Sequence, residues 1–363
     1  MIDIACFHLY NDYSGSPKVL RNVLEGLLDK GYVVNVITSD TDGALDELKG
    51  NDRIRYDYFH YSPHNNRIAW AFLLIYAQIC LFFKALKHKN CSVFYINTIM
   101  PVGAALAGKL LGKRVIYHYH ENAFIKSRFY RFLYRVMLFI ADEIICVSNY
   151  QRSFLPNNQN ISVVHNSLPQ SFTEKLSPDV KKAYSNNNIL MISSLVLYKG
   201  PIEFITLATK VKQYSFTLVL NETQDSIDYF IENNRLEIPK NLRIYPRQTE
   251  ISSFYNEASI LLNLSDKRKV IETFGMTALE GMSAGLPVIV PPVGGIAELV
   301  EDDVNGYKID VQELDAIAYK IDYMLQNYNV YQRLSEGALS TASSYSNKKM
   351  CDEIEKRINR NLM

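Results

Sequence analysis

The chain has 363 residues, with 39 Lys and Arg against 38 Asp and Glu, so its formal net charge at pH 7 is +1. Hydrophobic residues make up 48% and charged residues 21%, which is ordinary globular usage and excludes disordered and fibrous proteins. The balanced charge also disfavours a nonspecific nucleic-acid binder. This length favours about two domains.

The first part of the chain alternates predicted strands and helices. A strand pattern begins within MIDIACFHL, so we expect no secretory signal and a cytoplasmic protein. Pro17 favours a helix start, and Gly31 ends that helix. Further strands are predicted at 33–38, 93–97, 115–119 and 143–148, and further helices at 102–111 and 129–140. Such alternation predicts parallel βαβ units in a doubly wound sheet.

The run 68–83, IAWAFLLIYAQICLFF, is apolar except for Gln78. As a helix it would be about 24 Å long, short of the ~30 Å hydrocarbon core of a bilayer. We therefore expect a buried helix packed on a sheet. The alternative is a helix at a membrane interface, which Trp70 and the flanking Arg67 and Lys84 would suit.

A polar segment with Pro169 and Pro178 interrupts the alternation and predicts a linker over 171–187. The alternation then restarts, so we expect domains at 1–170 and 188–345 and a last helix, 346–363, that crosses back to the first domain. The strands predicted in the second domain are 189–193, 216–220, 242–245, 259–264 and 287–290. Its helices are predicted at 202–211, 225–233, 251–257, 276–284, 314–328 and 331–343.

Several common signatures are missing from the sequence. No GxGxxG, GxxxxGK[ST] or HExxH motif occurs, and the five Cys form no CxxC pair, which favours reduced, buried thiols. Asp40 and Asp42 have the spacing of a metal-binding DxD, but such pairs are common in loops. We therefore expect no metal site and no cofactor.

The most informative segment is 272–290, ETFGMTALEGMSAGLPVIV. Gly275 stands where a helix begins, and a glycine lets the amides of a helix start approach a phosphate or a sugar oxygen. Glu272 precedes this turn and Glu280 follows on the helix. A carboxylate accepts two hydrogen bonds, which suits the vicinal hydroxyls of a sugar.

This segment and the following VGGIAELV closely resemble the signature of retaining glycosyltransferase family 4, the group 1 glycosyl transferases. The resemblance implies a GT-B fold, with two facing Rossmann-like parallel-sheet domains and a cleft between them. It implies that a nucleotide-sugar donor binds mainly to the C-terminal domain, without a required metal. It also implies that Glu272 binds sugar hydroxyls and Glu280 binds ribose, with the amides of Phe274, Gly275 and Met276 facing the sugar and diphosphate.

Lys199 in SSLVLYKGP matches the lysine that stabilises the leaving diphosphate in this family. The family often has an arginine five residues earlier, where this chain has Ser194. Either another cation substitutes, with Arg247 and the run 267–269 as candidates, or the leaving group is stabilised less. Arg247 also lies where the family's loop meets the nucleobase.

In the N-terminal domain, Gly15 and Ser16 resemble a reduced form of the family's glycine loop near the diphosphate, although a plain helix cap is the alternative. His120 best fits the family's histidine near the reacting sugar. His118 lies on the same side of its strand and competes for that role. Asn166 matches a structural Asn that precedes the linker.

The helix predicted at 129–140 is preceded by Arg128 and carries Arg131 and Arg135 on the same face. We expect a solvated basic face over a buried aromatic one, and the alternative is docking on an anionic membrane surface. The family's bacterial members often extend lipid-linked glycans, which implies a peripheral location on the inner face of the cytoplasmic membrane.

Together these features predict a retaining, metal-independent glycosyltransferase that moves a hexose or N-acetylhexosamine, UDP-linked, to a glycan acceptor. We expect a lipid-linked acceptor in the synthesis of bacterial capsule, O-antigen or lipopolysaccharide. Two alternatives stay open at this point: a nucleotide-sugar 2-epimerase of GT-B fold, and a catalytically degenerate glycosyltransferase that acts as a partner subunit.

Overall fold

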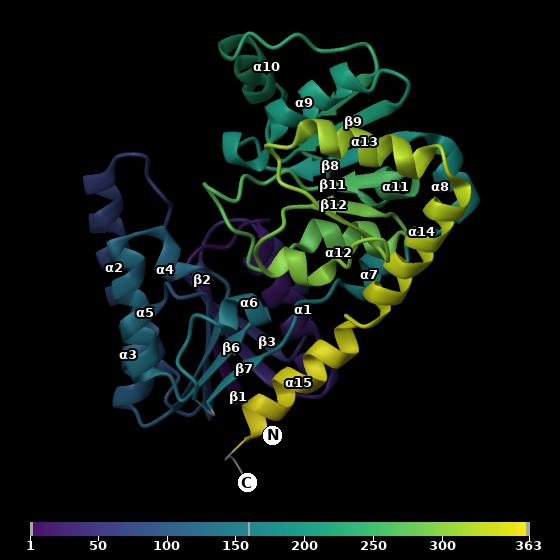
Figure 1. Ribbon diagram of the computed structural model, residues 1–363. Helices are drawn as coiled ribbons and strands as arrows, with labels where there is room; N and C mark the ends of the chain where they lie inside the picture. The colour runs from purple at the N-terminus through teal and green to yellow at the C-terminus, as the bar shows by residue number, and fades with distance from the viewer. Residues whose placement is uncertain (1–2, 159, 361–363) are drawn as a thin grey trace. The chain divides into compact units, whose positions relative to one another are not determined.

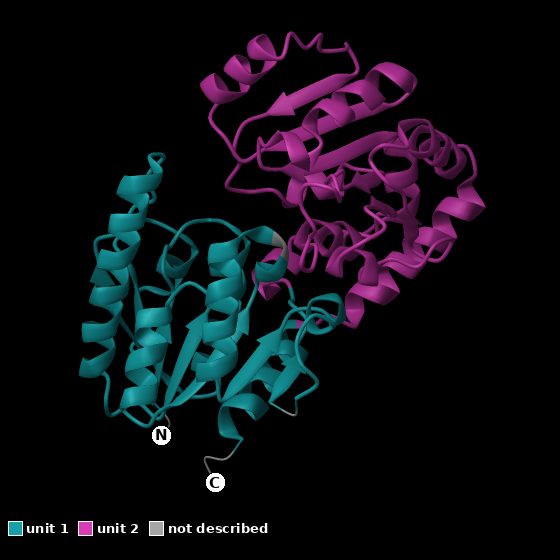
Figure 2. Cartoon of the chain, turned by 60° about the vertical axis from the view of Figure 1, so that its left-hand side comes forward, with its two compact units in different colours: residues 1–167, 347–363 teal, residues 168–346 magenta. Residues whose placement is uncertain are grey.

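The computed structural model describes residues 3–158 and 160–360. The chain divides into two compact units, which Figure 2 distinguishes by colour. Unit 1 comprises Met1–Ser167 and Asn347–Met363, and unit 2 comprises Leu168–Ser346. Each unit has its own parallel sheet, so the prediction of two Rossmann-like α/β domains is confirmed.

Unit 1 contains a seven-stranded parallel sheet in the order β3-β2-β1-β4-β5-β6-β7 (Figure 1). The strands are β1 (Asp3–Phe7), β2 (Val33–Ser39), β3 (Ile54–Phe59), β4 (Val93–Asn97), β5 (Arg114–Tyr119), β6 (Glu143–Cys146) and β7 (Ile161–Val163). The strand order reverses between β1 and β4. The carboxyl ends of these strands therefore flank the position at which open α/β sheets bind their ligands.

The helices of unit 1 are η1 (Ala44–Leu48), α1 (Gly15–Asp29), α2 (Arg67–Lys87), α3 (Val102–Leu110), α4 (Ala123–Lys126), α5 (Arg128–Ile140), α6 (Asn149–Arg152) and α15 (Asn347–Asn359). Buried side chains of α2, α3 and α5 join the same core cluster as Phe7, Phe94 and Tyr117 of the sheet. These three helices therefore cover one face of the sheet. α15 packs on α1, where Cys351 Sγ lies 3.7 Å from Asn22 O.

Unit 2 repeats the design with six parallel strands in the order β10-β9-β8-β11-β12-β13. The strands are β8 (Asn188–Ser193), β9 (Ser215–Leu220), β10 (Leu242–Tyr245), β11 (Ile260–Leu262), β12 (Val288–Val290) and β13 (Gly306–Lys308). The helices are α7 (Gln170–Thr173), α8 (Val180–Asn186), η2 (Leu197–Lys199), α9 (Pro201–Lys210), α10 (Gln224–Asn233), α11 (Ser252–Asn256), α12 (Met276–Ser283), η3 (Gly295–Leu299), α13 (Leu314–Leu325) and α14 (Tyr328–Ser343).

The segment predicted as a linker, 171–187, is part of unit 2 and contains most of α7 and all of α8. Asp179 starts α8 because its side chain accepts a hydrogen bond from Lys182 N at 3.0 Å. Ser259 Oγ donates to Ala183 O at 2.5 Å, which fixes α8 beside β11. The polar composition suggested a linker because only Ala183 of α8 is buried.

The prediction that 68–83 forms a buried helix is wrong for much of its surface. The run is helical within α2, but only Leu74, Ala77, Leu81 and Ala85 of this helix are buried. α2 is long and apolar enough to cross a membrane by length and composition, and only 22% of its most apolar window is buried. The reason is geometric: one stripe of a helix is enough to cover a sheet, and here the opposite stripe is apolar as well.

Candidate active site

The candidate site of unit 2 lies at the carboxyl ends of β8 and β11, where its strand order reverses. η2 and Gly200 follow β8 and lead into α9. A loop over 263–275 follows β11 and leads into α12. The topology alone therefore brings Lys199 and Glu272, which are far apart in sequence, to one edge of the sheet.

Two glycines hold these loops together. Gly200 has φ +83°, and a Cβ there would lie 2.5 Å from Leu264 O. Gly275 has φ +105°, and a Cβ there would lie 2.4 Å from Ile296 Cγ1. Because a larger residue would face both a left-handed backbone and a collision, only glycine allows these close turns.

Lys199 and Glu272 form an ion pair between Lys199 Nζ and Glu272 Oε1. Ser265 Oγ donates to the same oxygen at 2.7 Å. The two charged side chains are 23% and 19% exposed, so the pair is mostly shielded yet open to a ligand. Burial would raise the pKa of Glu272, but the charge and hydrogen bond of Lys199 outweigh it, and the pKa lies below its usual value. Glu272 is therefore ionised at neutral pH.

Glu280 lies one turn further along α12 and is anchored by a residue outside the recognised motif. The hydroxyl of Tyr255, which is fully buried, donates to Glu280 Oε2. Burial first, and then the charge of Glu280, raises the pKa of Tyr255 well above its usual value. Tyr255 thus stays protonated and fixes the orientation of the Glu280 carboxylate.

The carboxyl ends of β1, β4 and β5 in unit 1 carry a different kind of site. His120 Nε2 donates to Asn97 Oδ1 at 2.9 Å, because an amide oxygen can only accept. Asn97 Nδ2 donates in turn to His8 Nδ1 at 3.1 Å and to Ser16 O at 3.3 Å. Asn97 therefore orients both imidazoles and fixes which nitrogen of each carries the proton.

The histidines of this network are neutral. Burial lowers the pKa of His8 to about 4 and that of His118 to about 3. Burial first, and then the neighbouring His118 and His8, holds the pKa of His120 well below its usual value. The rings of His118 and His120 lie 4.2 Å apart, and Tyr95 Oη lies 2.8 Å from His118 Nδ1. These imidazoles can thus offer hydrogen bonds without charge.

Known sequence families cover nearly the whole chain. Residues 13–170 match the family described as Glycosyltransferase Family 4, and residues 172–341 match Glycosyl transferases group 1. The chain belongs to the family 4, group 1 glycosyltransferases. The predicted family is thereby confirmed, and the GT-B fold of its structural neighbours agrees with the two parallel sheets.

Similar proteins include the N-acetyl-alpha-D-glucosaminyl L-malate synthase of Bacillus anthracis, 22% identical over 98% of this chain and 95% of that protein. The structure of the Anabaena HepE protein in complex with UDP and glucose has a TM-score of 0.78 at 19% identity, covering 99% of this chain and all of that one. The apo lipopolysaccharide outer core galactosyltransferase WaaB has a TM-score of 0.72 at 16% identity, covering both chains fully. At these identities the two structures show the shared fold.

In this glycosyltransferase, the amides predicted to face the diphosphate lie at the start of α12, with Gly275 as its N-cap and Met276 as its first residue. The ring of Phe274 is buried and packs against Tyr345, with ring centroids 5.8 Å apart. Phe274 thus anchors the turn through its side chain. The ligand roles assigned to these residues stay predictions.

The start of α1 is more open than that of α12. α1 begins at Gly15, two residues before the predicted start at Pro17, with Ser14 as N-cap. Gly15 is exposed, and a Cβ there would meet nothing within 4 Å. Ser16 connects this turn to the imidazole network through its carbonyl, which accepts from Asn97.

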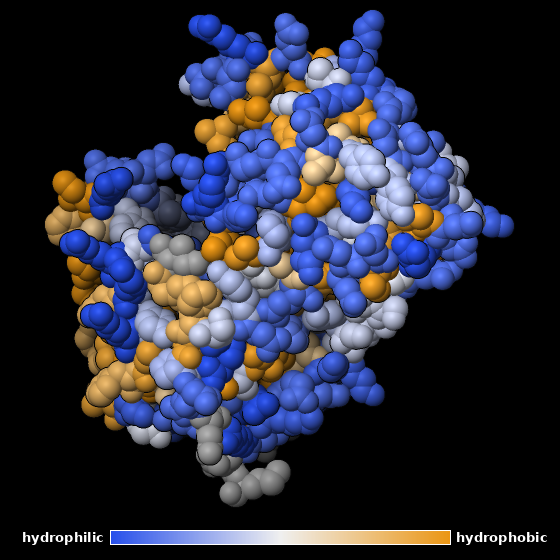
Figure 3. All heavy atoms as spheres, viewed as in Figure 1, coloured by the Kyte–Doolittle hydropathy of each residue, from blue (hydrophilic) through white to orange (hydrophobic). Residues whose placement is uncertain are grey.

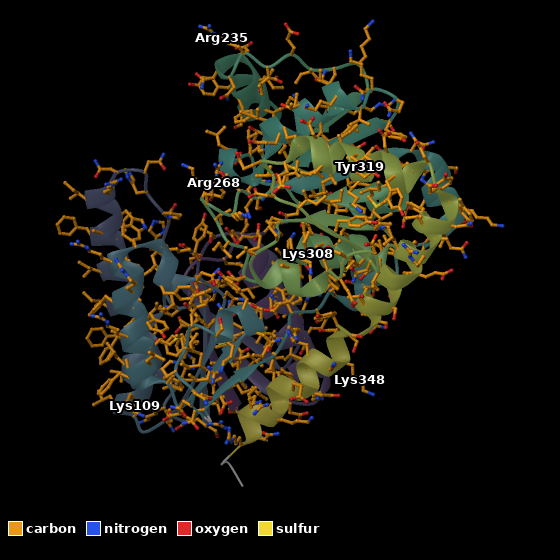
Figure 4. The ribbon with its side chains drawn as sticks, viewed as in Figure 1. Lys109, Arg235, Arg268, Lys308, Tyr319 and Lys348 are labelled. Carbon is orange, nitrogen blue, oxygen red and sulfur yellow. The ribbon has the colours of Figure 1, made fainter. Side chains whose placement is uncertain are left out.

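Among the candidates for the second cation, Lys269 is exposed, and the other three are engaged by other groups. Arg247 follows β10, which β9 separates from β8 in the sheet. Its Nε donates to Asn221 Oδ1 at 2.7 Å. Arg268, labelled in Figure 4, pairs with Asp266 at 2.9 Å, and Lys267 pairs with Asp310 at 2.9 Å. A ligand that recruits Lys267 or Arg268 would therefore have to displace a carboxylate.

No group of three or more His, Cys, Asp or Glu suited to a metal occurs among residues 3–158 and 160–360. Asp40, one of the two candidate DxD carboxylates, pairs with His60 at 3.1 Å. This contact lowers the pKa of Asp40. Asp42 is exposed.

Sequence reasoning missed several residues that the structure brings to the two edges. Asn97, His8, Tyr255 and Ser265 hold the predicted residues in place, as described above. Asn97 is the last residue of one predicted strand and Ser265 follows another, and that position was an available signal. Tyr255 belongs to a short helix outside the motif, so only its three-dimensional contact with Glu280 reveals it.

Proposed function

We propose that this chain is a retaining glycosyltransferase that transfers a hexose or N-acetylhexosamine from a UDP-sugar to a glycan acceptor. The observation that carries the proposal is the Lys199–Glu272 ion pair at the β8–β11 edge, in the loops that lead into α9 and α12. A sugar diphosphate presents an anion and a set of hydroxyls side by side. A cation beside an ionised carboxylate complements both parts.

The proposed chemistry is a front-face displacement. The bond between the anomeric carbon and the diphosphate oxygen breaks, and the diphosphate leaves toward Lys199 and the amides at the start of α12. The acceptor hydroxyl forms the new bond on the same face and gives its proton to the leaving phosphate oxygen. Glu272 holds the sugar hydroxyls, and charge stabilisation of the leaving group supplies most of the rate.

Different observations support the UDP donor, the glycan acceptor and the independence from metal. The UDP donor is supported by HepE, whose structures hold UDP, or UDP and glucose. A glycan acceptor in bacterial surface polysaccharide is supported by the fold shared with WaaB, a lipopolysaccharide galactosyltransferase. Metal independence is supported by Lys199 and the helix start, which together supply positive potential where a metal ion would otherwise act.

The first experiment is a thermal-shift screen of the full chain with UDP-, GDP-, ADP- and dTDP-sugars, because a ligand that binds the folded state raises the melting temperature. We expect the largest shift from a UDP-sugar. That donor is then incubated with candidate glycan acceptors in excess EDTA, and NMR gives the anomeric configuration. An α-linked product from an α-linked donor supports retention. An inverted product, or activity that returns only with added metal, would contradict the proposal.

One observation favours a second candidate, a degenerate glycosyltransferase that acts as a partner subunit. Ser194 stands at the position of the family's arginine, and the nearby cations Lys267 and Arg268 are held by carboxylates. This candidate predicts tight binding of a UDP-sugar without hydrolysis or transfer. Conversion of the UDP-sugar alone into an epimerised sugar nucleotide would instead favour a 2-epimerase.

A further inference from the structure

α2 carries a continuous stripe of large apolar side chains on the face opposite its buried one. The exposed fractions are 70% for Ile68 and Phe72, 58% for Ile75, 52% for Ile79 and 62% for Phe83. Their spacing of three or four residues aligns them along one side of the helix. A stripe of this size is unusual on the surface of a monomeric soluble protein and indicates an interaction site.

Neighbouring helices extend this surface. Gly103 N of α3 donates to Gln78 Oε1 of α2 at 2.9 Å, and the rings of Trp70 and Phe129 join α2 to α5 at 5.8 Å between centroids. α3 adds Leu106 and Leu110, and α5 adds Phe132 and Phe139, all at least 47% exposed. We call these four residues and the α2 stripe the apolar face. Figure 3 shows hydrophobic residues gathered over these helices at the left of the view.

The charged residues of the three helices that carry the apolar face have a single sign. α2, α3 and α5 contain no Asp or Glu. The exposed cations of α2 and α5, which we call the basic border, are Arg67, Lys87, Arg128, Arg131 and Arg135. Two further lysines of these helices are paired, Lys84 with Asp57 and Lys109 (labelled in Figure 4) with Asp142. A partner for this surface must therefore be apolar and anionic.

We propose that the apolar face and the basic border dock unit 1 on the surface of an anionic phospholipid bilayer. Acyl chains complement the apolar stripe, and lipid phosphates complement the arginines, as in interfacial amphipathic helices. A symmetric dimer through this face is disfavoured, because it would bring two arginine-rich borders together without an acidic partner. The proposal does not depend on the proposed catalytic activity.

α2 lies on the bilayer in this arrangement and does not cross it. Its inner face, with Ala77, Leu81 and Ala85 fully buried, is part of the core of unit 1. The backbones of α2 and α3 also approach closely, because a Cβ on Gly103 would lie 2.1 Å from Gln78 O. Insertion across a membrane would require removing this helix from the core.

The test is co-sedimentation of the full chain with vesicles of phosphatidylcholine alone or with roughly one-third phosphatidylglycerol, at low and high salt. The basic variant is Arg128→Gln, Arg131→Gln and Arg135→Gln, and its matched control changes three exposed lysines of unit 2, Lys181→Gln, Lys212→Gln and Lys240→Gln. The apolar variant is Phe72→Gln, Ile79→Gln and Phe83→Gln. Its control is Tyr229→Gln and Tyr319→Gln, at side chains that are 70% and 65% exposed on unit 2. Circular dichroism confirms that each variant folds.

We expect the wild type and both controls to prefer anionic vesicles, and their binding to weaken as salt rises. The basic variant should lose roughly a hundredfold in partition coefficient at low salt, about fivefold for each arginine. The apolar variant should lose at least about tenfold, since it removes side chains that insert between lipids. No preference of the wild type for anionic vesicles, or variants that bind like their controls, would overturn the proposal. So would a dimer in sedimentation velocity that the apolar variant dissociates while vesicles remain unbound.

Discussion

The carboxyl edges of the two sheets carry different polar groups, although the first six strands of each unit follow the same order. The edge of unit 2 holds an ion pair, Lys199 with Glu272, and a second carboxylate, Glu280. The edge of unit 1 holds the neutral imidazoles of His8 and His120 joined by an amide. Sheets of the same topology thus bury polar groups in two ways. In unit 2 the opposite charges of an ion pair offset the cost of burial, and in unit 1 the hydrogen-bonded imidazoles carry no charge. The edge of unit 2 suits the charged part of a nucleotide sugar.

The largest effect is expected for Glu272→Gln, which removes the charge of unit 2's edge and keeps the shape of the side chain. Transfer activity should fall by about two orders of magnitude or more, since the hydrogen bonds to the sugar are no longer charge-assisted. Steady-state kinetics of the folded variant measures this. The control is Glu232→Gln on the exposed surface of α10, which should retain wild-type activity. Near-wild-type turnover of Glu272→Gln would remove Glu272 from the donor site.

Gly275→Ala and Gly15→Ala compare the helix starts at the two edges. Alanine at position 275 would have to adopt φ +105°, and its Cβ would collide with Ile296. We therefore expect a loss of about 2–4 kcal/mol in the free energy of unfolding. Alanine at Gly15 meets open space, and the change should stay within about 0.5 kcal/mol. Urea unfolding measures both variants. Equal costs at the two positions would contradict the packing described for α12.

The pH dependence of stability should show that the buried imidazoles at the edge of unit 1 are neutral. The folded-state pKa values of His8 (about 4) and His118 (about 3) lie below the ordinary value of 6.5. Below pH 6.5 the unfolded chain binds more protons than the folded chain does. The stabilisation is therefore fully present above pH 6.5 and is lost as the pH falls towards the folded-state pKa values. At about pH 5.5 each histidine should cost about 1 kcal/mol relative to pH 7. Glu272, whose pKa is lowered from 4.5, stays ionised over this range.

Urea unfolding at the two pH values, together with NMR titration of the imidazoles, checks this expectation. A free energy of unfolding that does not change between them, with His8 or His118 titrating near 6.5, would show that unit 1 has a charged edge as well.

A smaller effect is expected for Asn97→Asp, which introduces charge at the edge of unit 1. The carboxylate would favour protonated His120 and His8, so their pKa values should rise and the pH–rate profile should gain a new limb. We expect roughly a tenfold loss of turnover at neutral pH. Asn51→Asp is the control, because its side-chain oxygen accepts from Arg53 N in an exposed turn and an aspartate can do the same. A profile like that of the control would separate this network from the reaction.

Strands that are buried on both faces were predictable because their apolar runs are short and bounded by turns. The predicted strand at 93–97 coincides with β4, which is buried along its whole length. The predicted strand at 242–245 coincides with β10, although only Leu242 of this edge strand is buried. β3 was missed, because its exposed and half-buried residues interleave arginine and aspartate with aromatic residues. β13 was missed because it has only three residues.

The motif located the candidate site, but its supporting contacts were not predictable. Glu272 and Gly275 were recognisable because the helix start after a Phe-Gly turn is encoded locally. Tyr255 holds Glu280 from a different element, and Asn97 orients His120 from a neighbouring strand, so both depend on the tertiary fold. The exposure of α2 was mispredicted because hydrophobicity alone does not show which stripe of a helix meets the sheet.

The charged edge of unit 2 is proposed to bind a nucleotide sugar through both residues of its ion pair. Lys199 contacts the diphosphate, and Glu272 contacts the sugar. Calorimetric titration of UDP and of a UDP-sugar into the wild type, Lys199→Met and Glu272→Gln tests this proposal most directly. Lys199→Met should weaken both ligands by roughly 10- to 100-fold, as expected for the loss of a charge-assisted hydrogen bond. Glu272→Gln should weaken only the UDP-sugar and leave the affinity for UDP within about twofold. Unchanged binding of UDP to Lys199→Met, or an equal loss of both ligands in Glu272→Gln, would contradict this account.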